Sequence, residues 1–144
     1  MMVKDLLARK GATVVTIEPG STVADVVAAL VKYRVGSLVV SGDGRHIDGI
    51  VSERDVVRGL NNHGVELLQM AVSDLMTANV LSCEPTQETA WVARTMTEHR
   101  FRHMPVTLDG VLYGIVSIGD LVKNRIDELE TEQGQLVSYI SQSG

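Results

Sequence analysis

Aromatic side chains are scarce in this 144-residue chain, and their scarcity limits what its core can contain. Phe, Trp and Tyr together make up 3% of the residues, whereas hydrophobic residues as a whole make up 44%. The core must therefore be filled by the aliphatic side chains of Val, Leu, Ile, Ala and Met. The single tryptophan, Trp91, lies near the start of an expected helix, and there partial burial and a role as an interface anchor are equally compatible with the sequence.

Cysteine, positive charge and long apolar runs are also in short supply. Cys83 is the only cysteine, so an internal disulfide is excluded and a reducing compartment is expected. The formal net charge of −5 argues against a nonspecific nucleic-acid surface, which requires clustered positive charge. No apolar run approaches the length of a membrane span, and the N-terminus lacks the pattern of a secretion signal. We therefore expect a cytoplasmic protein that binds neither nucleic acid nor membrane.

What the chain does contain is an internal repeat. Residues 49–55 read Gly-Ile-Val-Ser-Glu-Arg-Asp, and residues 114–120 read Gly-Ile-Val-Ser-Ile-Gly-Asp. Val-Lys-Asp-Leu-Leu at 3–7 is matched by Val-Ser-Asp-Leu-Met at 72–76. Such a repeat indicates two copies of one supersecondary unit, each too small to bury its own apolar face. Duplication also places equivalent polar groups near a pseudo-two-fold axis, where we expect a ligand cleft.

Each copy predicts the order strand, helix, strand, strand, helix. Short β-branched or apolar runs between turn residues favour the strands, and apolar residues three and four apart favour the helices. In the first copy we expect strands over 13–17, 35–40 and 47–51, with helices that begin after Thr22 and at Ser52. In the second copy we expect strands over 80–83, 104–108 and 111–116, with helices over 89–99 and from Ser117.

The domain boundaries follow from the repeat and from polar stretches. The break between the copies is expected near 61–64, so the first repeat takes residues 1–64 and the second takes residues 65–130. Residues 131–144 form a polar tail whose Ser-Gln-Ser-Gly end is expected to fray.

This arrangement resembles a pair of cystathionine-β-synthase (CBS) domains. The similarity covers the chain to about residue 130 and rests on four features that occur in both copies: the leading Val-x-Asp-Leu, the Glu-Pro after the first strand, the turn before the last strand, and Gly-Ile-Val-Ser-x-x-Asp. Arg102-His103-Met104-Pro105-Val106 also resembles the usual start of the family's second strand, whereas the first copy departs there with Gly36-Ser37-Leu38-Val39-Val40. The resemblance implies a stand-alone CBS pair (Bateman module), an α+β fold with two β-α-β-β-α repeats about a pseudo-two-fold axis.

The repeated Ser-x-x-Asp has two interpretations. At a helix start it is a variant of the capping box, in which the serine oxygen accepts a backbone N–H and the acid favours the positive end of the helix. The resemblance to the CBS family implies a further role, in which Asp55 and Asp120 accept hydrogen bonds from ribose hydroxyls while Ser52 and Ser117 bind ribose or phosphate. The two roles are compatible, because a helix N-terminus attracts anions.

A nucleotide cleft also needs an apolar slot and positive groups. The candidates for the slot are Val14, Val15, Val35, Val80, Leu81, Met104 and Pro105, for most of which ordinary core packing is part of the explanation. Among the candidates for phosphate we favour Arg54, Arg102 and His103 over Arg100, although each of these could be solvated surface. Gly119 stands where the first copy has Arg54, so the two sites cannot be equivalent. We expect the second copy to bind more tightly, because it contains Arg102 and His103.

The leading functional hypothesis is a regulatory binding module for adenine nucleotides. AMP is the first candidate, with ATP, ADP or an adenine dinucleotide such as NAD(H) as alternatives, and binding would act on an unidentified protein partner by conformational change. The rival is a structural or interaction module with vestigial clefts. An enzyme is not expected, because no nucleophile–base set appears. No metal is expected either, since His99 and His103 lack a third ligand.

We also expect a homodimer. Each lobe has more apolar helix surface than a thin sheet can cover, and exposed apolar patches usually mark an interface. The candidates for this surplus are Val56, Leu60, Leu121, Val122 and Ile126.

Overall fold

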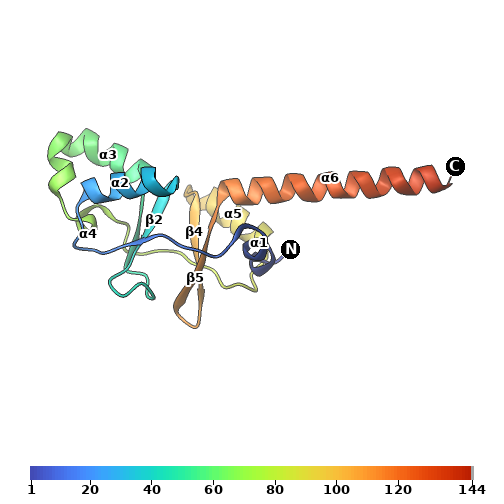
Figure 1. Ribbon diagram of the computed structural model, residues 1–144, viewed down its shortest axis with the longest axis horizontal. Helices are drawn as coiled ribbons and strands as arrows, with labels where there is room; N and C mark the ends of the chain where they lie inside the picture. Colours follow the sequence, from blue (N-terminus) through green and yellow to red (C-terminus); the bar gives the residue numbers. More distant parts are fainter. Residues whose placement is uncertain (144) are drawn as a thin grey trace.

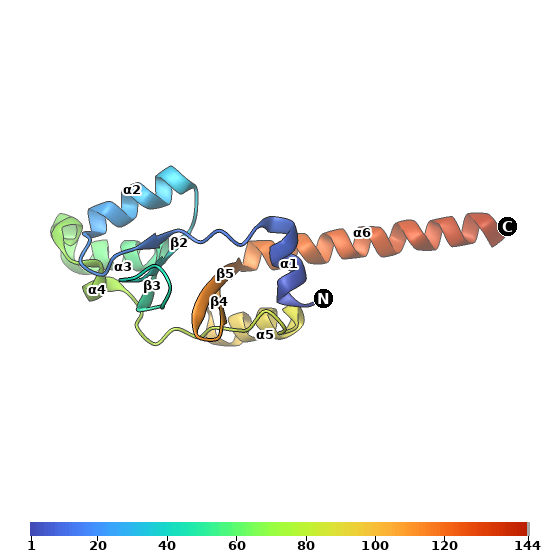
Figure 2. The same ribbon diagram turned by 60° about the horizontal axis from the view of Figure 1, so that its bottom comes forward.

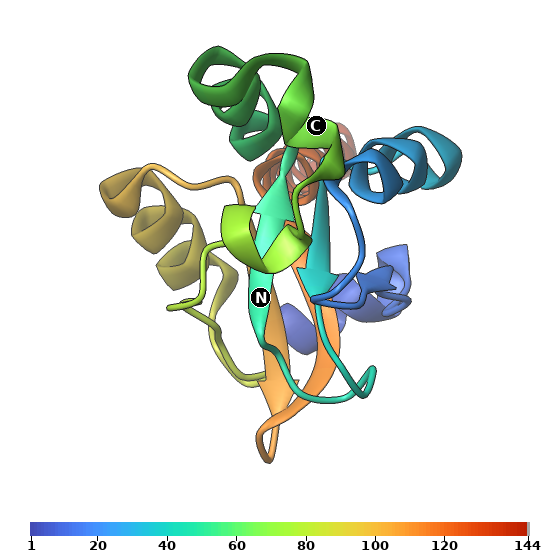
Figure 3. The ribbon, with the colours of Figure 1, turned by 90° about the vertical axis from the view of Figure 1, so that its left-hand side faces the viewer.

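The computed structural model describes residues 1–143 as two small lobes and one long helix (Figure 1). The elements are, in chain order, α1 (Val3–Lys10), β1 (Thr16–Ile17), α2 (Val23–Tyr33), β2 (Ser37–Val40), β3 (Gly49–Ser52), α3 (Glu53–His63), the 3₁₀ helix η1 (Gly64–Gln69), α4 (Val72–Leu75), α5 (Thr89–His99), β4 (His103–Leu108), β5 (Val111–Ser117) and α6 (Ile118–Ser143). The strands lie in the middle and the helices surround them, as the end-on view in Figure 3 shows.

The strands form one sheet in each lobe. In the first lobe β1 pairs parallel to β2, and β2 pairs antiparallel to β3, with Leu38 opposite Val51. In the second lobe β4 and β5 form an antiparallel pair, with Met104 opposite Val116. The first lobe has the strand–helix–strand–strand–helix order that the sequence predicts, although β1 is shorter than the strand expected over 13–17. The second lobe has the same order without its first strand.

The strand expected over 80–83 does not form, and Pro105 explains why. In the first lobe the Val39 N–H donates to the Val15 carbonyl and the Ser41 N–H donates to the Ile17 carbonyl. In the second lobe the Thr107 N–H donates to the Cys83 carbonyl, but the counterpart of Val39 is Pro105, which has no N–H to donate. The pairing is therefore limited to a bridge between Cys83 and Val106.

Three further differences concern helices. The short elements α1, η1 and α4 were not expected, and α3 runs to His63 with η1 directly after it instead of a loop at 61–64. Helix α6 passes through Glu130 without a break and is helical to Ser143, so the described part of the Ser-Gln-Ser-Gly end is helical rather than frayed. Gly144, the last residue of that tail, lies outside the described residues.

Each core contains residues from both sequence copies. Val3, Leu6 and Leu7 of α1 pack with the second-copy core around Met96 and Met104. Conversely, Val72 of α4 packs with the first-copy core around Leu38. The leading segment of each repeat is thus exchanged with the other lobe, and Figure 2 shows α1 beside β5 and α4 beside α3. The boundaries at 64 and 130 remain predictions from the sequence.

The apolar helix residues named above as a surplus divide into two groups. Val56 and Leu121 are buried in the two cores, so they are not available to a partner. Leu60, Val122 and Ile126 are exposed by 42%, 53% and 50%, so they remain candidates for an interface.

Candidate functional site

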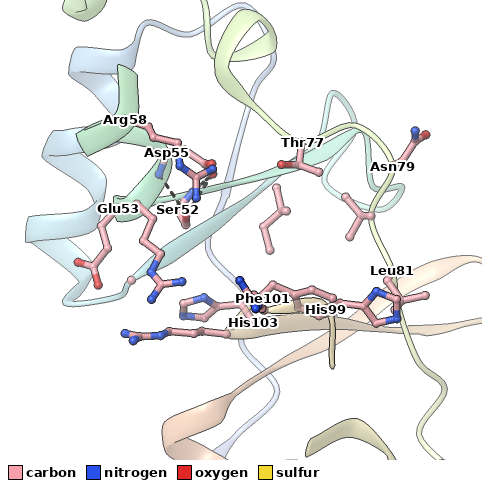
Figure 4. Close-up of a pocket in the computed structure, with 16 residues that line it drawn as sticks. Ser52, Glu53, Asp55, Arg58, Thr77, Asn79, Leu81, His99, Phe101 and His103 are labelled. Atoms are coloured by element: carbon pink, nitrogen blue, oxygen red, sulfur yellow. Dashed lines mark hydrogen bonds between the residues drawn. The ribbon is translucent and has the colours of Figure 1, made fainter. Parts of the chain in front are cut away.

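A cavity of about 530 Å³ lies between the two lobes. Its walls come from the start of α3, the connecting segment 77–81 and the segment 99–103 that leads into β4. We call it the Asp55 cleft. In Figure 4, Asp55 and Arg58 approach it from α3, while Phe101 and His103 form the opposite wall. Its volume falls within the range of small-molecule sites, roughly 300–1,000 Å³.

Asp55 and Ser52 form a complete capping box at the start of α3. The Asp55 Oδ2 accepts from the Ser52 N–H at 2.8 Å, and the Ser52 Oγ accepts from the Asp55 N–H at 3.3 Å. The capping interpretation is therefore correct. It occupies only one carboxylate oxygen, because Oδ1 of Asp55 has no hydrogen bond within residues 1–143. One oxygen of a half-buried carboxylate is left to accept from a ligand.

Four arginines line the same cleft: Arg54, Arg58, Arg100 and Arg102. None of them forms an ion pair in the described part of the chain, where the cationic partners of the ion pairs are Lys10, His46 and Arg125. The cleft contains two acids, Glu53 and Asp55, so its formal charge is positive in a protein whose net charge is −5. A cleft of this sign attracts anions.

His103 forms a wall shared by two cavities. It lines both the Asp55 cleft and a second cavity, and Gly36 lines both as well. Burial lowers the pKa of His103, Lys10 and Arg102 lower it further, and the nearby carboxylates of Glu53 and Asp120 act in the opposite direction. Because the net pKa lies below the ordinary 6.5, the ring is neutral at pH 7.

The second cavity, about 280 Å³ in volume, contains Asp120. In this Asp120 cleft, Asp120 and Ser117 repeat the capping box, with the Ser117 N–H donating to Oδ2 at 2.9 Å. The same oxygen also accepts from Lys10 Nζ at 2.7 Å. Burial raises the pKa of Asp120, but the hydrogen bonds from Lys10 and Ser117 outweigh it, and the net pKa is lowered. Unlike Asp55, Asp120 is already neutralised by a cation.

The exchanged leading segments explain why each cleft combines both copies. The Asp55 cleft takes its apolar side from Val80 and Leu81 of the second copy, and the Asp120 cleft takes Val15 and Val35 from the first. One further pair of hydrogen bonds is equivalent in the two copies. The Glu53 N–H donates to the Gly36 carbonyl at 3.0 Å, and the Ile118 N–H donates to the Arg102 carbonyl at 2.8 Å. The starts of α3 and α6, which carry Asp55 and Asp120, are thus held in the same way.

The structure divides the residues predicted for the site into three sets. The Asp55 cleft contains Ser52, Arg54, Asp55, Val80, Leu81, Arg102 and His103. The Asp120 cleft contains Val15, Val35, Ser117, Asp120 and again His103, together with Val14. Neither cleft is lined by Met104 or Pro105, which are buried. The side chain of Met104 lies in the second core. The neighbouring Pro105 uses its carbonyl within the sheet, where it accepts from the Cys83 N–H.

One premise of the sequence analysis was misplaced. Tighter binding was expected for the second copy because it contains Arg102 and His103, but Arg102 lines the cleft of the first-copy aspartate, Asp55. Arg100, which we ranked below Arg102, lines the same cleft. The crossing of the copies was not visible in the sequence, where each motif was read with its own repeat.

Three basic lining residues, Lys10, Arg34 and Arg58, were missed altogether. Arg58 lies one helical turn after Arg54, a spacing that places both on one face of α3. Arg34 and Arg100 occupy equivalent positions in the repeat, both with left-handed backbone at the end of a helix, with φ of 53° and 59°. Comparing the copies position by position would have found this pair. No sequence signal points to Lys10 as the cation beside Asp120.

The sequence matches the CBS domain family over residues 3–62 and 72–127, so the chain belongs to the CBS-domain family. A CBS-domain containing protein from Agrobacterium tumefaciens is 43% identical, with a TM-score of 0.84 and coverage of 87% of this chain and 99% of that one. These matches confirm both the resemblance and the predicted α+β fold with two CBS repeats.

Two further relatives are similar over more than four fifths of this chain. The mitochondrial CBS domain-containing protein CBSX3 of Arabidopsis thaliana is 34% identical over 123 residues, which are 83% of this chain and 60% of that protein. The chain thus spans about three fifths of that relative's length. CBSX2, solved in complex with AMP, is 30% identical with a TM-score of 0.72, and the match covers 88% of this chain and 96% of that one.

Among the described residues, no three His, Cys, Asp or Glu side chains gather as a metal site would require. Within residues 1–143, no helix combines the length and apolar character needed to cross a bilayer.

Proposed function

We propose that this CBS pair is a regulatory module that binds an adenine nucleotide in the Asp55 cleft, with AMP as the leading ligand. One observation carries the proposal: a carboxylate with a free oxygen, at a helix N-terminus, faces four arginines without ion-pair partners in the described chain. Ribose hydroxyls need an acceptor and phosphate needs cations, and the cleft offers both. The AMP bound to the relative CBSX2 supports the choice of nucleotide.

The lining of the cleft suggests how AMP would lie. The ribose hydroxyls would donate to Oδ1 of Asp55, and adenine would pack against the apolar side chains of Ile50, Val80 and Leu81. The phosphate would then face the arginines, which form charge-assisted hydrogen bonds to phosphate oxygens. ATP, ADP and an adenine dinucleotide such as NAD(H) share the adenosine part and remain alternatives.

The Asp120 cleft is proposed as a weaker second site. It is about half as large, at 280 Å³ against 530 Å³. Lys10 already holds Asp120 at 2.7 Å, so a ribose would compete with an ion pair. We therefore expect the Asp55 cleft to fill first.

Regulation would follow from the position of the clefts between the lobes. A nucleotide in the Asp55 cleft contacts α3 of one lobe and the segment before β4 of the other, so it favours one relative position of the two. We propose that the protein works as a homodimer and that this change is transmitted to a partner protein that is still to be identified. No catalytic step forms part of the proposal.

The second candidate is a structural or interaction module with vestigial clefts. It is favoured by the complete capping boxes, which already give Asp55 and Asp120 a structural role. The two candidates differ in the response to ligand.

Thermal unfolding with and without AMP separates the two candidates. At about 100 times its dissociation constant, a bound ligand raises the free energy of unfolding by about 2.7 kcal/mol. We expect a corresponding rise in the melting temperature with AMP, a smaller one with GMP, and none with inorganic phosphate at the same ionic strength. ATP, ADP and NAD(H) would be measured alongside. Equal melting temperatures with all of these ligands would reject the nucleotide site and favour the structural module.

A further inference from the structure

Helix α6 carries an apolar stripe that no element of the described chain covers. Val122, Ile126, Leu129, Leu136 and Ile140 are between 47% and 60% exposed. In Figure 1 the second half of α6 stands clear of the rest of the molecule. An exposed apolar stripe of this length on a soluble helix requires an explanation.

The spacing of the stripe is that of a coiled coil. Its residues follow one another at alternating intervals of four and three, from Val122 to Ile140, with Gln133 at one of the positions. This 3.5-residue period keeps a stripe on one side of a helix that winds around a partner. We call these six positions, 122, 126, 129, 133, 136 and 140, the α6 seam.

The seam and the contact with the body lie on different sides of the helix. Leu121 and Asn124 are buried against the body, where Asn124 Oδ1 accepts from Arg9 Nη1 at 3.5 Å. At about 100° per residue, the seam is centred roughly a third of a turn away from these two residues. Docking of α6 on its own lobe therefore leaves the seam free.

We propose that the α6 seam pairs with the α6 seam of a second copy of this chain, parallel and in register. Isoleucine occupies one of the two alternating seam positions, at 126 and 140, and leucine occupies the other, at 129 and 136. A β-branched residue at the first position with leucine at the second favours two parallel strands. Gln133 then faces Gln133 of the second copy, and a polar residue at such a position fixes register and the number of strands.

The charges beside the seam are complementary in this arrangement. Arg125 and Glu130 flank the seam on opposite edges, five residues apart. In a parallel pair in register, Arg125 of one copy lies near Glu130 of the other, so two pairs of opposite charges form. In the single chain Arg125 contacts Glu128 at 3.2 Å, an exposed ion pair of little energetic weight.

This inference rests on the homodimer of the proposed function, but not on the nucleotide site. The seam covers two and a half heptads, which is short for an independent coiled coil. The pairing therefore has to be tested in the full chain, with the lobes present.

Cysteine cross-linking tests both the pairing and its direction. The native Cys83 is buried, and burial raises its pKa to about 11, so it does not compete with an introduced thiol. Under mild oxidation, Gln133→Cys and Ile140→Cys should each give a covalent dimer, because a parallel pair brings each seam position against itself. Thr131→Cys, exposed on the opposite side of the helix, is the control and should stay monomeric on a denaturing gel.

Each other outcome contradicts the proposal. A cross-link at only one seam position indicates an antiparallel pair, since only one residue then meets its own copy. If neither position cross-links while light scattering still gives the mass of a dimer, the interface lies elsewhere. Equal cross-linking of the control shows random collisions.

A charged variant separates the seam from the nucleotide site. Leu136→Lys with Ile140→Lys places like charges along the seam, and the dimer should weaken by at least about tenfold in sedimentation equilibrium. The affinity of each chain for AMP should stay unchanged, because neither residue lines a cleft. An unchanged dimer affinity in this variant would overturn the pairing through the α6 seam. If the wild-type protein does not bind AMP, only the nucleotide site is overturned.

Discussion

Asp55 and Asp120 occupy equivalent positions in the two repeats, yet their surroundings differ. Both cap a helix through Oδ2, but only Asp120 is also bound by a lysine, Lys10. Around Asp55 the cations are arginines that contact no acid in the described chain. The repeat therefore duplicates the capping carboxylate but leaves the positive groups around it unequal in the two clefts.

Arg58→Gln tests the phosphate side of the Asp55 cleft. Arg58 is exposed, so water screens its charge and its contribution is that of a surface ion pair, about 0.2–1 kcal/mol. We expect the affinity for AMP to fall by about 1.4- to fivefold, with no change for adenosine, which lacks the phosphate. Calorimetry of both ligands measures this difference. Arg94→Gln, which changes an exposed arginine of α5 that lines neither cleft, is the control, and an equal loss in both variants would contradict the assignment.

His103→Gln tests the buried imidazole between the clefts. Its pKa is lowered in the folded chain, so below the ordinary 6.5 the unfolded chain binds a proton that the folded chain does not. The wild-type protein should lose this part of its stability as the pH falls below 6.5 towards the folded pKa, and should have all of it above 6.5. The groups facing the ring are Glu53, Asp120, Lys10 and Arg102.

The measurement is urea unfolding of wild type and His103→Gln between pH 7.5 and 5. The difference in free energy of unfolding between the two proteins should change with pH only below 6.5, with the wild type losing more. A difference that stays constant over the whole range would show that His103 is not buried as a neutral ring.

Among the elements, the long helices could be predicted from the sequence and the short ones could not. Helices α2, α3 and α5 have apolar residues at regular spacing, and Thr22 caps α2 through the expected bond from the Asp25 N–H. Helices α1 and α4 have eight and four residues, too few for a periodic pattern to stand out. The missing strand at 80–83 depends on the backbone of a distant proline, Pro105, a long-range effect that local patterns do not contain.

The packing role of Gly49 also appears only in the structure. A Cβ on Gly49 would lie 2.8 Å from the Thr77 carbonyl oxygen and 2.6 Å from the Met76 Sδ. That carbonyl cannot move away freely, because it accepts from the Ile50 N–H at 3.0 Å. The glycine lets the exchanged segment of the second copy lie directly on β3.

Gly49→Ala should therefore destabilise the protein by about 1–3 kcal/mol, the range for overpacking a tight site. Gly20→Ala is the matched control, since a Cβ there meets nothing within 4 Å, and its effect should stay within about 0.5 kcal/mol. Urea unfolding of the two variants gives the comparison. Equal stabilities would mean that the segment at 76–77 does not pack on β3 as described.

For the molecule as a whole, the exchange of leading segments determines where the clefts lie. The sequence predicts two repeats, an acidic residue in each, and apolar and basic residues to complete a cleft. It does not show that Val80 and Leu81 of the second copy complete the cleft of Asp55, because that depends on how the two lobes pack. The consequence for function is that a single nucleotide would contact both lobes.

The central claim is that Asp55 binds the ribose of AMP in addition to capping α3, and calorimetry of AMP binding to two variants tests it most directly. Asp55→Ala removes a capping acid inside the cleft, whereas Asp25→Ala removes the equivalent capping acid of α2, which lines neither cleft. Each loses about 0.3–1 kcal/mol of helix stabilisation.

Only Asp55→Ala should also lose binding. Each hydrogen bond to a charged group contributes about 1.5–3 kcal/mol, so the affinity for AMP should fall by at least about tenfold. Asp25→Ala should bind AMP as the wild type does. If Asp55→Ala is destabilised to the same extent as Asp25→Ala and binds AMP with wild-type affinity, the carboxylate is only a cap and the account of the cleft is wrong.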